Sequence, residues 1–569
     1  MFLVISLCVI FTLCEPACGV PFKSERCRNI PGDPKWPSRK DWDILNETVN
    51  GRLISSVPIA TICHGSNFQP GQCQELQESW PFASIHVQKP AEFLAPYFQN
   101  QSCDPFTARQ KPCELGNYAS YSINVSTVSH VQAGIKFARD NNIRLTIKNT
   151  GHDLLGKSTG KGALSLWTHH MNKIDFIDRY DGDFDYYGPA VRLGAGVLTS
   201  EVFTAANNAG VRVVTGTCPD VGTAGGFTSG GGHGVFTSVY GMAADNVLEW
   251  EIVTAHGEHI VATPISHADL YWALSGGGAG TFAVVISLVV RTYPDGMMGG
   301  AQLSFDTGTA AGVDKFWEGV EAFQSALGSV VDTGAVASFL LTQDALDVYG
   351  ISMPDRNLST IDKILQPVVQ AMEDVGVAVN VTKSTHSGFL DFYNQYFLPA
   401  VTTTPSAQIT GGRLIPRSIA ENTTESARVV RAYRTATEAG FGIVCDAVQA
   451  DRAPAFANAV FPIWRSSLLS CIFVKTWDFS VPRGEMVAYQ ANLTQFVMPE
   501  IEAATPNGGA YLNEANFQQP SWQNEFYGTN YPRLKSMKDS VDPLGVFYAR
   551  TAVGSEEWAE DAQGRLCRT

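Results

Sequence analysis

Glycine is concentrated in three parts of this 569-residue chain, at residues 149–152, 218–234 and 275–280. Each cluster adjoins a short apolar run that is typical of a buried strand. Because glycine has no side chain, a glycine-rich loop lets backbone N–H groups approach a phosphate closely. Any one cluster alone is better explained by a tight turn or a close crossing of strands. Three of them together favour one large anionic cofactor held between loops.

Two glycine segments match nucleotide-binding patterns, but each stands in the wrong context. Residues 151–158, GHDLLGKS, satisfy the P-loop pattern. A P-loop opens a helix, whereas the next residues contain two more glycines and alternate like a strand. Residues 278–283 satisfy G-x-G-x-x-A, but they precede a strand instead of following one. We therefore expect neither a P-loop nucleotidase nor a dinucleotide fold of the usual order.

The first residues predict export from the cell. Residues 2–14 are one apolar run, followed by the small residues 17–19, a pattern that resembles a signal peptide cleaved after residue 19. A membrane anchor is the alternative, but about 13 residues is shorter than the ~20 that a spanning helix needs. No later stretch is long enough to span a bilayer. The sequence thus predicts a secreted protein that is soluble once cleaved.

The cysteine count is informative in that setting. Cleavage removes three of the twelve cysteines and leaves nine, an odd number, in an oxidising compartment. Close spacing suggests two local disulfides, Cys63 with Cys73 and Cys103 with Cys113. Four more, Cys27, Cys445, Cys471 and Cys567, remain for longer closures, and the pairing stays open. At least one cysteine must then be free, intermolecular or otherwise engaged.

Charge and glycosylation signals agree with an extracellular setting. Lys and Arg number 40 against 55 Asp and Glu, which gives a net charge of -15 and argues against nucleic acid or an anionic membrane as partner. Seven Asn-x-Ser/Thr sequons predict N-glycosylation of the surface. They are Asn46, Asn100, Asn124, Asn357, Asn380, Asn422 and Asn492.

The pattern of helices and strands divides the chain into an α+β arrangement of two domains. A disulfide-stapled N-terminal region is followed by a domain of mixed helices and strands, and then by a second region of alternating amphipathic helices and strands that predicts an α/β domain. The aromatic-rich tail is too short to fold alone and should pack back onto an earlier domain. The signal peptide is predicted at 1–19, the N-terminal region at 20–114, the first domain at 115–299, the second domain at 300–507 and the tail at 508–569.

Several segments together resemble a known family. Residues 147–171, 216–234, 240–257 and 269–282, with AYLNEA at 510–515 and residues 526–548, are similar to the berberine bridge enzyme-like flavoproteins of the vanillyl-alcohol oxidase superfamily. The amino-acid sequences of the last two segments resemble those of a fungal branch that includes isoamyl alcohol oxidase-like proteins. The resemblance implies a vanillyl-alcohol oxidase-type fold: an FAD-binding domain at 115–299, closed by 508–569, with an inserted substrate-binding domain at 300–507.

The resemblance also implies how FAD is held. His152 matches the histidine that bonds to the 8α carbon of the flavin, and Cys218 matches the cysteine that bonds to C6 in bicovalent members. Using Cys218 in this way leaves eight cysteines, an even set for disulfides. Further cofactor-binding residues are expected in the same loops and the tail. They are Asn149, Thr150, Gly151, Asp153, Ser158, Val221, Gly222, Gly225, Gly226, Gly230, Gly232, His233, Tyr240 and Asn513.

The implied chemistry is oxidation of a carbinol. Tyr511 matches the family's active-site tyrosine and is the expected base for the hydroxyl proton, although a phenol of pKa near 10 needs activation for that role. Val221 resembles the position that admits oxygen in oxidases of the family. Asp220 replaces the more usual threonine, with no consequence that the sequence reveals. The predicted reaction passes a hydride from an alcohol or carbohydrate to flavin N5, and O2 then reoxidises the flavin to give H2O2.

Other functions remain open at this stage. The same flavin could carry out oxidative cyclisation or dehydrogenation of an alkaloid-like secondary metabolite, or the protein could bind FAD without turnover. The adjacent His169 and His170 are not expected to share a metal ion, because neighbouring side chains on a strand point to opposite faces. The expected partners are a small-molecule substrate and O2, for a protein that acts as a monomer.

Overall fold

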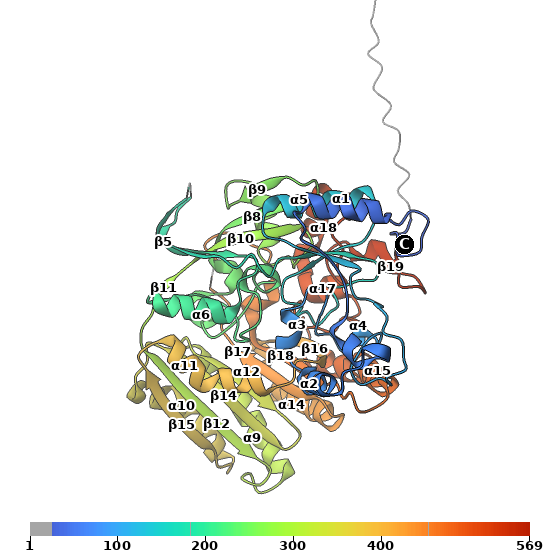
Figure 1. The fold of residues 1–569 in the computed structure, drawn as a ribbon. Coiled ribbons are helices and arrows are strands. Elements are labelled where there is room, and N and C mark those ends of the chain that lie inside the picture. The colour runs from blue at the N-terminus through green and yellow to red at the C-terminus, as the bar shows by residue number, and fades with distance from the viewer. Residues whose placement is uncertain (1–25, 183, 453) are drawn as a thin grey trace, which may run out of the picture.

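The computed structural model describes residues 26–569 except 183 and 453. The predicted signal peptide, residues 1–19, lies outside the described residues. In Figure 1 the chain forms two parts, with a four-stranded and a five-stranded sheet in the upper part and a seven-stranded sheet in the lower part.

The four-stranded sheet has the order β1-β2-β4-β3, and it includes a strand from the N-terminal region. β2 and β3 run parallel to β4, whereas β1 pairs antiparallel with β2. The helix predicted from residue 128 is α5 (Val128–Asp140), and Thr127 caps it by accepting a hydrogen bond from the backbone N–H of His130. The strands are β1 (Leu53–Ser55), β2 (Tyr121–Asn124), β3 (Leu145–Lys148) and β4 (Leu164–Trp167).

The five-stranded sheet has the order β5-β6-β10-β8-β9 and is antiparallel. Its strands are β5 (Ile174–Asp181), β6 (Tyr187–Gly194), β8 (Val247–Thr254), β9 (His259–Ala262) and β10 (Ala283–Arg291), with helices α6 (Thr199–Asn208) and α8 (Ala268–Leu274) between them in sequence. The strand expected at 211–216 is confined to β7 (Val211–Arg212), which pairs with β11 (Tyr293–Pro294). The chain after β7 leads into the second glycine cluster.

The seven-stranded sheet is antiparallel throughout, with the order β15-β12-β14-β13-β17-β18-β16. The alternation of helices and strands is present, but the helices link strands that pair antiparallel, so this part is not a parallel α/β unit. Helices α9 (Val313–Val331), α10 (Leu358–Asp374) and α14 (Thr423–Glu438) pack against it (Figure 1). The strands are β12 (Met298–Asp306), β13 (Val336–Leu341), β14 (Ala345–Pro354), β15 (Asn380–His386), β16 (Gln408–Pro416), β17 (Gly442–Ala447) and β18 (Ser467–Thr476).

Side chains alternate between the two faces of this sheet, as the pleat requires. On β17 and β18, Cys445, Cys471 and Phe473 belong to the core shared with the helices. Their neighbours Val444 and Ile472 are half-buried and line a cavity on the opposite face. The helical layer therefore covers one face, and the other face is left to form a site.

Four disulfides are present; two are the local pairs that the sequence suggested, and the other two settle the pairing that it left open. They are Cys27–Cys567, Cys63–Cys73, Cys103–Cys113 and Cys445–Cys471. Cys445 and Cys471 face each other directly in the register of β17 and β18. Within the described part of the chain, Cys218 is the cysteine left without a disulfide.

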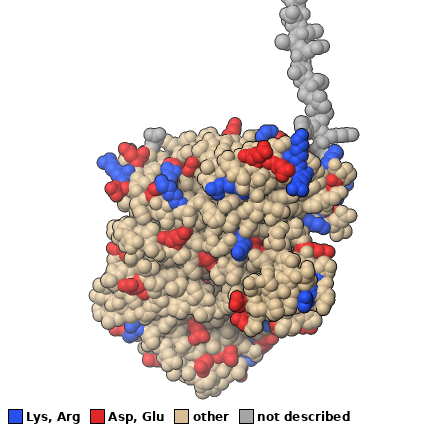
Figure 2. All heavy atoms as spheres, in the orientation of Figure 1, with Lys and Arg blue, Asp and Glu red and all other residues tan. Residues whose placement is uncertain are grey.

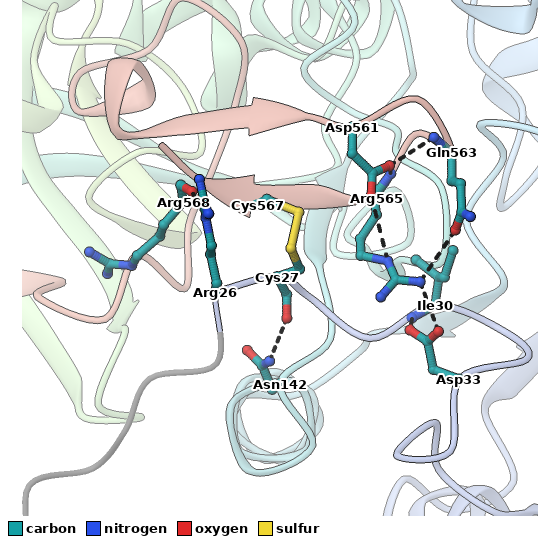
Figure 3. Close-up of a disulfide and its surroundings, with 10 residues drawn as sticks. All are labelled: Arg26, Cys27, Ile30, Asp33, Asn142, Asp561, Gln563, Arg565, Cys567 and Arg568. Atoms are coloured by element: carbon teal, nitrogen blue, oxygen red, sulfur yellow. Dashed lines mark hydrogen bonds and ion pairs between the residues drawn. A yellow bond between two sulfur atoms is a disulfide. The ribbon is translucent and has the colours of Figure 1, made fainter.

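The disulfide Cys27–Cys567 joins the two ends of the described chain (Figure 3). Asn142, which follows α5, donates a hydrogen bond to the carbonyl of Cys27, and Arg565 forms an ion pair with Asp33 over 2.8 Å. The C-terminal tail is thereby fixed to the N-terminal region on the side of the four-stranded sheet.

The tail also returns to the five-stranded sheet, as its composition predicted. Lys538 lies on α18 (Tyr531–Val541), which packs against α8. Its buried ammonium donates to the carbonyls of Thr281 and Phe547, and it pairs with the fully buried Asp542 over 2.7 Å. The hydrogen bond from Lys538 to Thr281 fastens the tail to the residues that precede β10, and Asp542 balances the buried charge.

The surface carries mixed charge. Figure 2 shows Lys and Arg interspersed with Asp and Glu on one face. None of the seven sequon asparagines is buried. Among the described residues, no helix is both long enough and apolar enough to cross a membrane.

Candidate active site

A cavity of about 1400 Å³ lies between the two parts of the molecule. All three glycine clusters contribute to one wall, the third through Ala279 and Gly280, and β13, β14, β17 and β18 contribute to another. The volume exceeds the ~300–1,000 Å³ of most ligand pockets and leaves room for a cofactor with a substrate. The predicted residues that line it are Asn149, Thr150, Gly151, His152, Asp153, Ser158, Cys218, Val221, Gly222, Gly225, Gly226, Tyr511 and Asn513.

Four predicted residues do not line the cavity. Tyr240 instead stacks on Tyr293, with ring centroids 3.7 Å apart. Gly230 and Gly232 lie in the layer behind the wall, where a side chain at Gly230 would collide with the amide of Asn513. His233 also lies behind the wall, between two carboxylates described below.

Gly222 shows why the second loop needs glycine. A Cβ atom there would lie 1.9 Å from Nδ2 of Asn149, a residue of the first loop. Asn149 donates through Nδ2 to the carbonyl of Ala195 over 2.6 Å. Its Oδ1 lines the cavity side, is buried and has no hydrogen-bond partner among the described residues. A buried acceptor of this kind fits a bound group that donates a hydrogen bond.

His152 is held at the cavity by Asp220. Its Nε2 lies 3.2 Å from Oδ1 of Asp220, and both side chains are half-buried. Burial opposes protonation of the imidazole, but the hydrogen bond and charge of Asp220 outweigh it and raise the pKa of His152. Because Asp220 occupies Nε2, the other ring nitrogen, Nδ1, remains the atom that can form a bond elsewhere. Asp220, whose role the sequence left open, therefore orients this ring.

Cys218 lies in the same part of the cavity wall. The preceding carbonyl, that of Thr217, accepts a hydrogen bond of 2.8 Å from the hydroxyl of Tyr393, which holds the loop in place. Burial raises the pKa of the Cys218 thiol to about 12, and the charges of Asp220, Glu514 and Asp446 act in the same direction. Such a thiol reacts as a nucleophile only if a nearby base takes its proton.

The P-loop-like segment does not adopt P-loop geometry. No helix follows within residues 151–163, and β4 is the next element. Asp153 closes a turn instead, since its carboxylate accepts from the backbone N–H groups of Leu155 and Ser158. Lys157 lines the cavity and donates to the carbonyl of Leu512.

The two adjacent histidines are engaged separately. His169 and His170 lie in the turn after β4, beyond the end of the strand. His169 Nε2 contacts the amide of Gln88, and His170 Nδ1 contacts Oδ1 of Asn124. Among the described residues there is no group of three metal-ligating side chains.

A charged cluster, Asp446–His233–Glu514, joins β17, the second glycine cluster and the tail beside the cavity. His233 Nε2 lies 3.2 Å from Glu514, and Nδ1 lies 3.4 Å from Asp446. His233 is 7% exposed, whereas the carboxylates are 25% and 28% exposed and line the cavity. Burial opposes the charge on His233, but the two carboxylates outweigh it and raise its pKa to about 9. The cluster therefore places two carboxylates, bridged by an imidazolium, on the cavity wall.

Tyr511 adjoins this cluster. Its ring lies 5.2 Å from that of His233, and its hydroxyl accepts a hydrogen bond of 2.8 Å from Asn513, which also donates to the carbonyl of Gly226. Burial, with the charge of Glu514, raises the pKa of Tyr511. His233 is a neighbouring cation, but burial and the charge of Glu514 prevail and disfavour the phenolate. The phenol is therefore placed for contact with a ligand, and the neighbouring carboxylates are the stronger proton acceptors.

Sequence reasoning missed Asp446 and Glu514. Asp446 follows Cys445 on β17, so the disulfide that turns Cys445 toward the helices turns Asp446 toward the cavity. Its hydroxyl partner, Ser338, faces it from β13 and donates to its carboxylate. The only available signal was this alternation next to a paired cysteine. Glu514 stands beside the Tyr-Leu-Asn segment that the sequence had singled out.

Comparison with known proteins agrees with this geometry. Residues 119–263 match the model of an FAD binding domain, and residues 510–554 match that of berberine and berberine-like proteins. The chain is 45% identical to the VAO-type flavoprotein oxidase VAO615 of Thermothelomyces thermophilus over 96% of each chain. The chain belongs to the VAO-type, berberine bridge enzyme-like flavoproteins. It is accordingly an FAD-linked oxidoreductase of the vanillyl-alcohol oxidase-type fold.

Two further members of the family are informative. The bifunctional decalin synthase calF of Penicillium decumbens is 44% identical over 98% of each chain. The crystal structure of the VAO-type flavoprotein MtVAO615 from Myceliophthora thermophila superposes with a TM-score of 0.92, at 44% identity, over 95% of this chain and all of that one. Relatives of nearly equal identity thus carry names for different reactions.

The residues on the glycine-rich wall fit FAD. The loops meet around one large cavity, and His152 and Cys218 both line its wall. The buried side-chain oxygen of Asn149 has no hydrogen-bond donor among the described residues. When bound, FAD supplies a two-electron acceptor that can take a hydride from a substrate. The protein supplies its position and the groups that move protons.

Proposed function

We propose that this protein is a secreted, N-glycosylated FAD oxidase that oxidises the carbinol carbon of an alcohol or carbohydrate and returns the electrons to O2. The observation that carries the proposal is that His152 and Cys218 line the same cavity as Asp446 and Glu514, the two carboxylates of the Asp446–His233–Glu514 cluster. We further propose that residues 115–299 and 508–569 form the FAD-binding domain, that 300–507 form the substrate domain and that the protein acts as a monomer.

Covalent attachment of FAD at both His152 and Cys218 is part of this proposal. Asp220 occupies Nε2 of His152 and so leaves Nδ1 as the attaching atom. The described chain forms four disulfides, and Cys218 takes part in none of them. Its proton has acceptors nearby in the carboxylates that raise its pKa.

The proton of the substrate hydroxyl goes to a carboxylate of the cluster. Burial raises the pKa of Asp446 and so makes its carboxylate a better proton acceptor, whereas the raised pKa of Tyr511 disfavours a phenolate. Tyr511 and Asn513, which line the cavity and contact each other, would then orient the hydroxyl group. That Tyr511 is the base, as the resemblance implies, stays a prediction.

Covalent attachment is tested by precipitating the purified protein with acid. We expect the yellow chromophore to stay with the protein and the intact mass to exceed that of the chain by one FAD. A Cys218→Ser variant should keep the flavin through His152 but show a shifted absorbance spectrum. Release of all flavin into the supernatant, or a titratable Cys218 thiol in the native holoenzyme, contradicts the covalent links.

Oxidase activity is tested without a substrate. Anaerobic chemical reduction of the flavin, followed by O2, should give rapid reoxidation with formation of H2O2. A Val221→Leu variant, which fills the cavity wall beside Cys218, should slow this step, and Val261→Leu on the exposed surface of β9 should not. A reduced flavin that persists in air contradicts the proposed oxidase.

A second reaction is favoured by one specific observation, the 44% identity to a decalin synthase across the full chain. In that case the same flavin and carboxylates would oxidise a C–H bond of a secondary metabolite and lead to ring closure or desaturation. This alternative predicts flavin reduction by a ring precursor and no reduction by any alcohol.

A further inference from the structure

The face of the seven-stranded sheet that lines the cavity has two kinds of surface. Ser338 pairs with Asp446, and Asp446 pairs with Ser470, so the inner row is polar. The next row consists of Leu340, Val444 and Ile472, which are cross-strand neighbours and line the cavity. The polar row and the apolar row are thus adjacent on this face of the sheet.

The apolar surface continues outward along β18. Val474 follows Ile472 on the same face and lies opposite Gly442, which adds no polar group. At ~3.3 Å per residue, the distance along the strand from Ser470 to Val474 is about 13 Å. Beyond β18, Phe479 lines the cavity and stacks on Phe106 of the N-terminal region, with ring centroids 4.6 Å apart. We name Leu340, Val444, Ile472 and Val474 the apolar floor.

This arrangement discriminates between substrate classes. An oligosaccharide carries hydroxyl groups on every ring, and a hydroxyl buried without a partner is costly. The apolar floor itself offers such groups no partner, and the polar residues that line the cavity nearby, among them Asp347, Gln408 and Lys475, lie around it. A hydrocarbon body gains from the same surface, by about a factor of four for each buried methylene.

We propose that the substrate is an alcohol with an elongated hydrocarbon body, its carbinol at the Asp446 row and its chain along the apolar floor. This rests on the proposed oxidase function and narrows it by excluding oligosaccharides. The hydroxyl proton passes to a carboxylate of the cluster, the carbinol hydrogen leaves as a hydride to FAD, and O2 receives both electrons and becomes H2O2. The product is the corresponding ketone or aldehyde.

The test measures anaerobic flavin reduction by a homologous series of alkan-2-ols and by xylo- and gluco-oligosaccharides. We expect kcat/KM to rise about fourfold per methylene and to level off once the chain is longer than the floor. A Val444→Thr variant, nearly equal in volume, should lose several-fold in kcat/KM for the longest alcohols and lose less for the shortest. The matched control is Val261→Thr, on the exposed surface of β9.

Each outcome bears on the proposal. Oligosaccharides that reduce the flavin better than long alcohols, a kcat/KM independent of chain length, or a Val444→Thr variant equal to the control overturns it. If no alcohol reduces the flavin while the chemically reduced enzyme still reacts with O2, the substrate inference fails and the oxidase stands. If reoxidation fails as well, the proposed function itself is wrong.

Discussion

The raised pKa of His233 depends on two carboxylates, and substitution can neutralise either one separately. Its pKa is raised from 6.5 to about 9, which corresponds to about 3 kcal/mol in favour of the protonated form. Burial acts against this, so the carboxylates together contribute more than that figure. Glu514 makes the larger contribution, through both charge and a hydrogen bond. We therefore expect Glu514→Gln to lower the pKa of His233 by at least about one unit.

The assay uses the bound flavin as reporter, since a charge change beside the cavity perturbs its absorbance. The wild-type holoenzyme should show a spectral step with an apparent pKa near 9, and Glu514→Gln should show it at lower pH. Glu485→Gln is the matched control, because Glu485 lines the same cavity but does not contribute to the His233 shift. A step at the same pH in all three proteins refutes the assignment of charge to this cluster.

The same shift has a consequence for stability. Because the folded pKa of His233 lies above its unfolded value, the stabilisation is fully present below pH 6.5 and is lost as pH rises through about 9. Wild-type protein should lose about 3 kcal/mol of unfolding free energy from this group over that window. The Glu514→Gln variant should lose less, as measured by denaturant unfolding at pH 6 and pH 9.5.

Three further predictions follow from individual contacts. Asp220→Asn should slow covalent attachment of FAD when apo-protein is reconstituted, measured as flavin fluorescence on a denaturing gel, because the imidazole of His152 loses its carboxylate partner. Asp542→Asn should lower the free energy of unfolding by ~3–5 kcal/mol, since it leaves the buried Lys538 charge unpaired, whereas Asp539→Asn on the exposed face of the same helix should cost ~1 kcal/mol or less. Gly222→Ala should reduce FAD content per chain, measured from the flavin absorbance, since the added Cβ would displace Asn149.

Local features of the sequence predicted the loops that line one side of the cavity, although Gly230, Gly232, His233 and Tyr240 do not line it. Each glycine cluster marks a loop whose backbone needs the conformational freedom of glycine, and this need is visible in the local sequence. Cysteine spacing suggested two of the four disulfides, and the odd count agreed with the separate role that the resemblance implied for Cys218. The helix from residue 128 and the strands around it form as their periodicity predicts.

The substrate side depends on pairings that no local pattern records. Asp446 and Glu514 meet His233 only because β17, the tail and the second glycine cluster converge, across 281 residues between His233 and Glu514. Parallel and antiparallel sheets share the same alternation of helices and strands, so 300–507 read as α/β. The position of β1 in the four-stranded sheet is likewise a long-range pairing, from residues 53–55 to 121–123.

The most direct measurement is anaerobic mixing of the holoenzyme with a long-chain alkan-2-ol, followed by admission of O2. We predict that the yellow absorbance of the flavin bleaches with the alcohol, returns fully in O2 and yields H2O2 equimolar with the flavin. An absorbance that stays unchanged with the alcohols, or a reduced flavin that does not react with O2, would contradict the account of this protein as an oxidase of apolar alcohols.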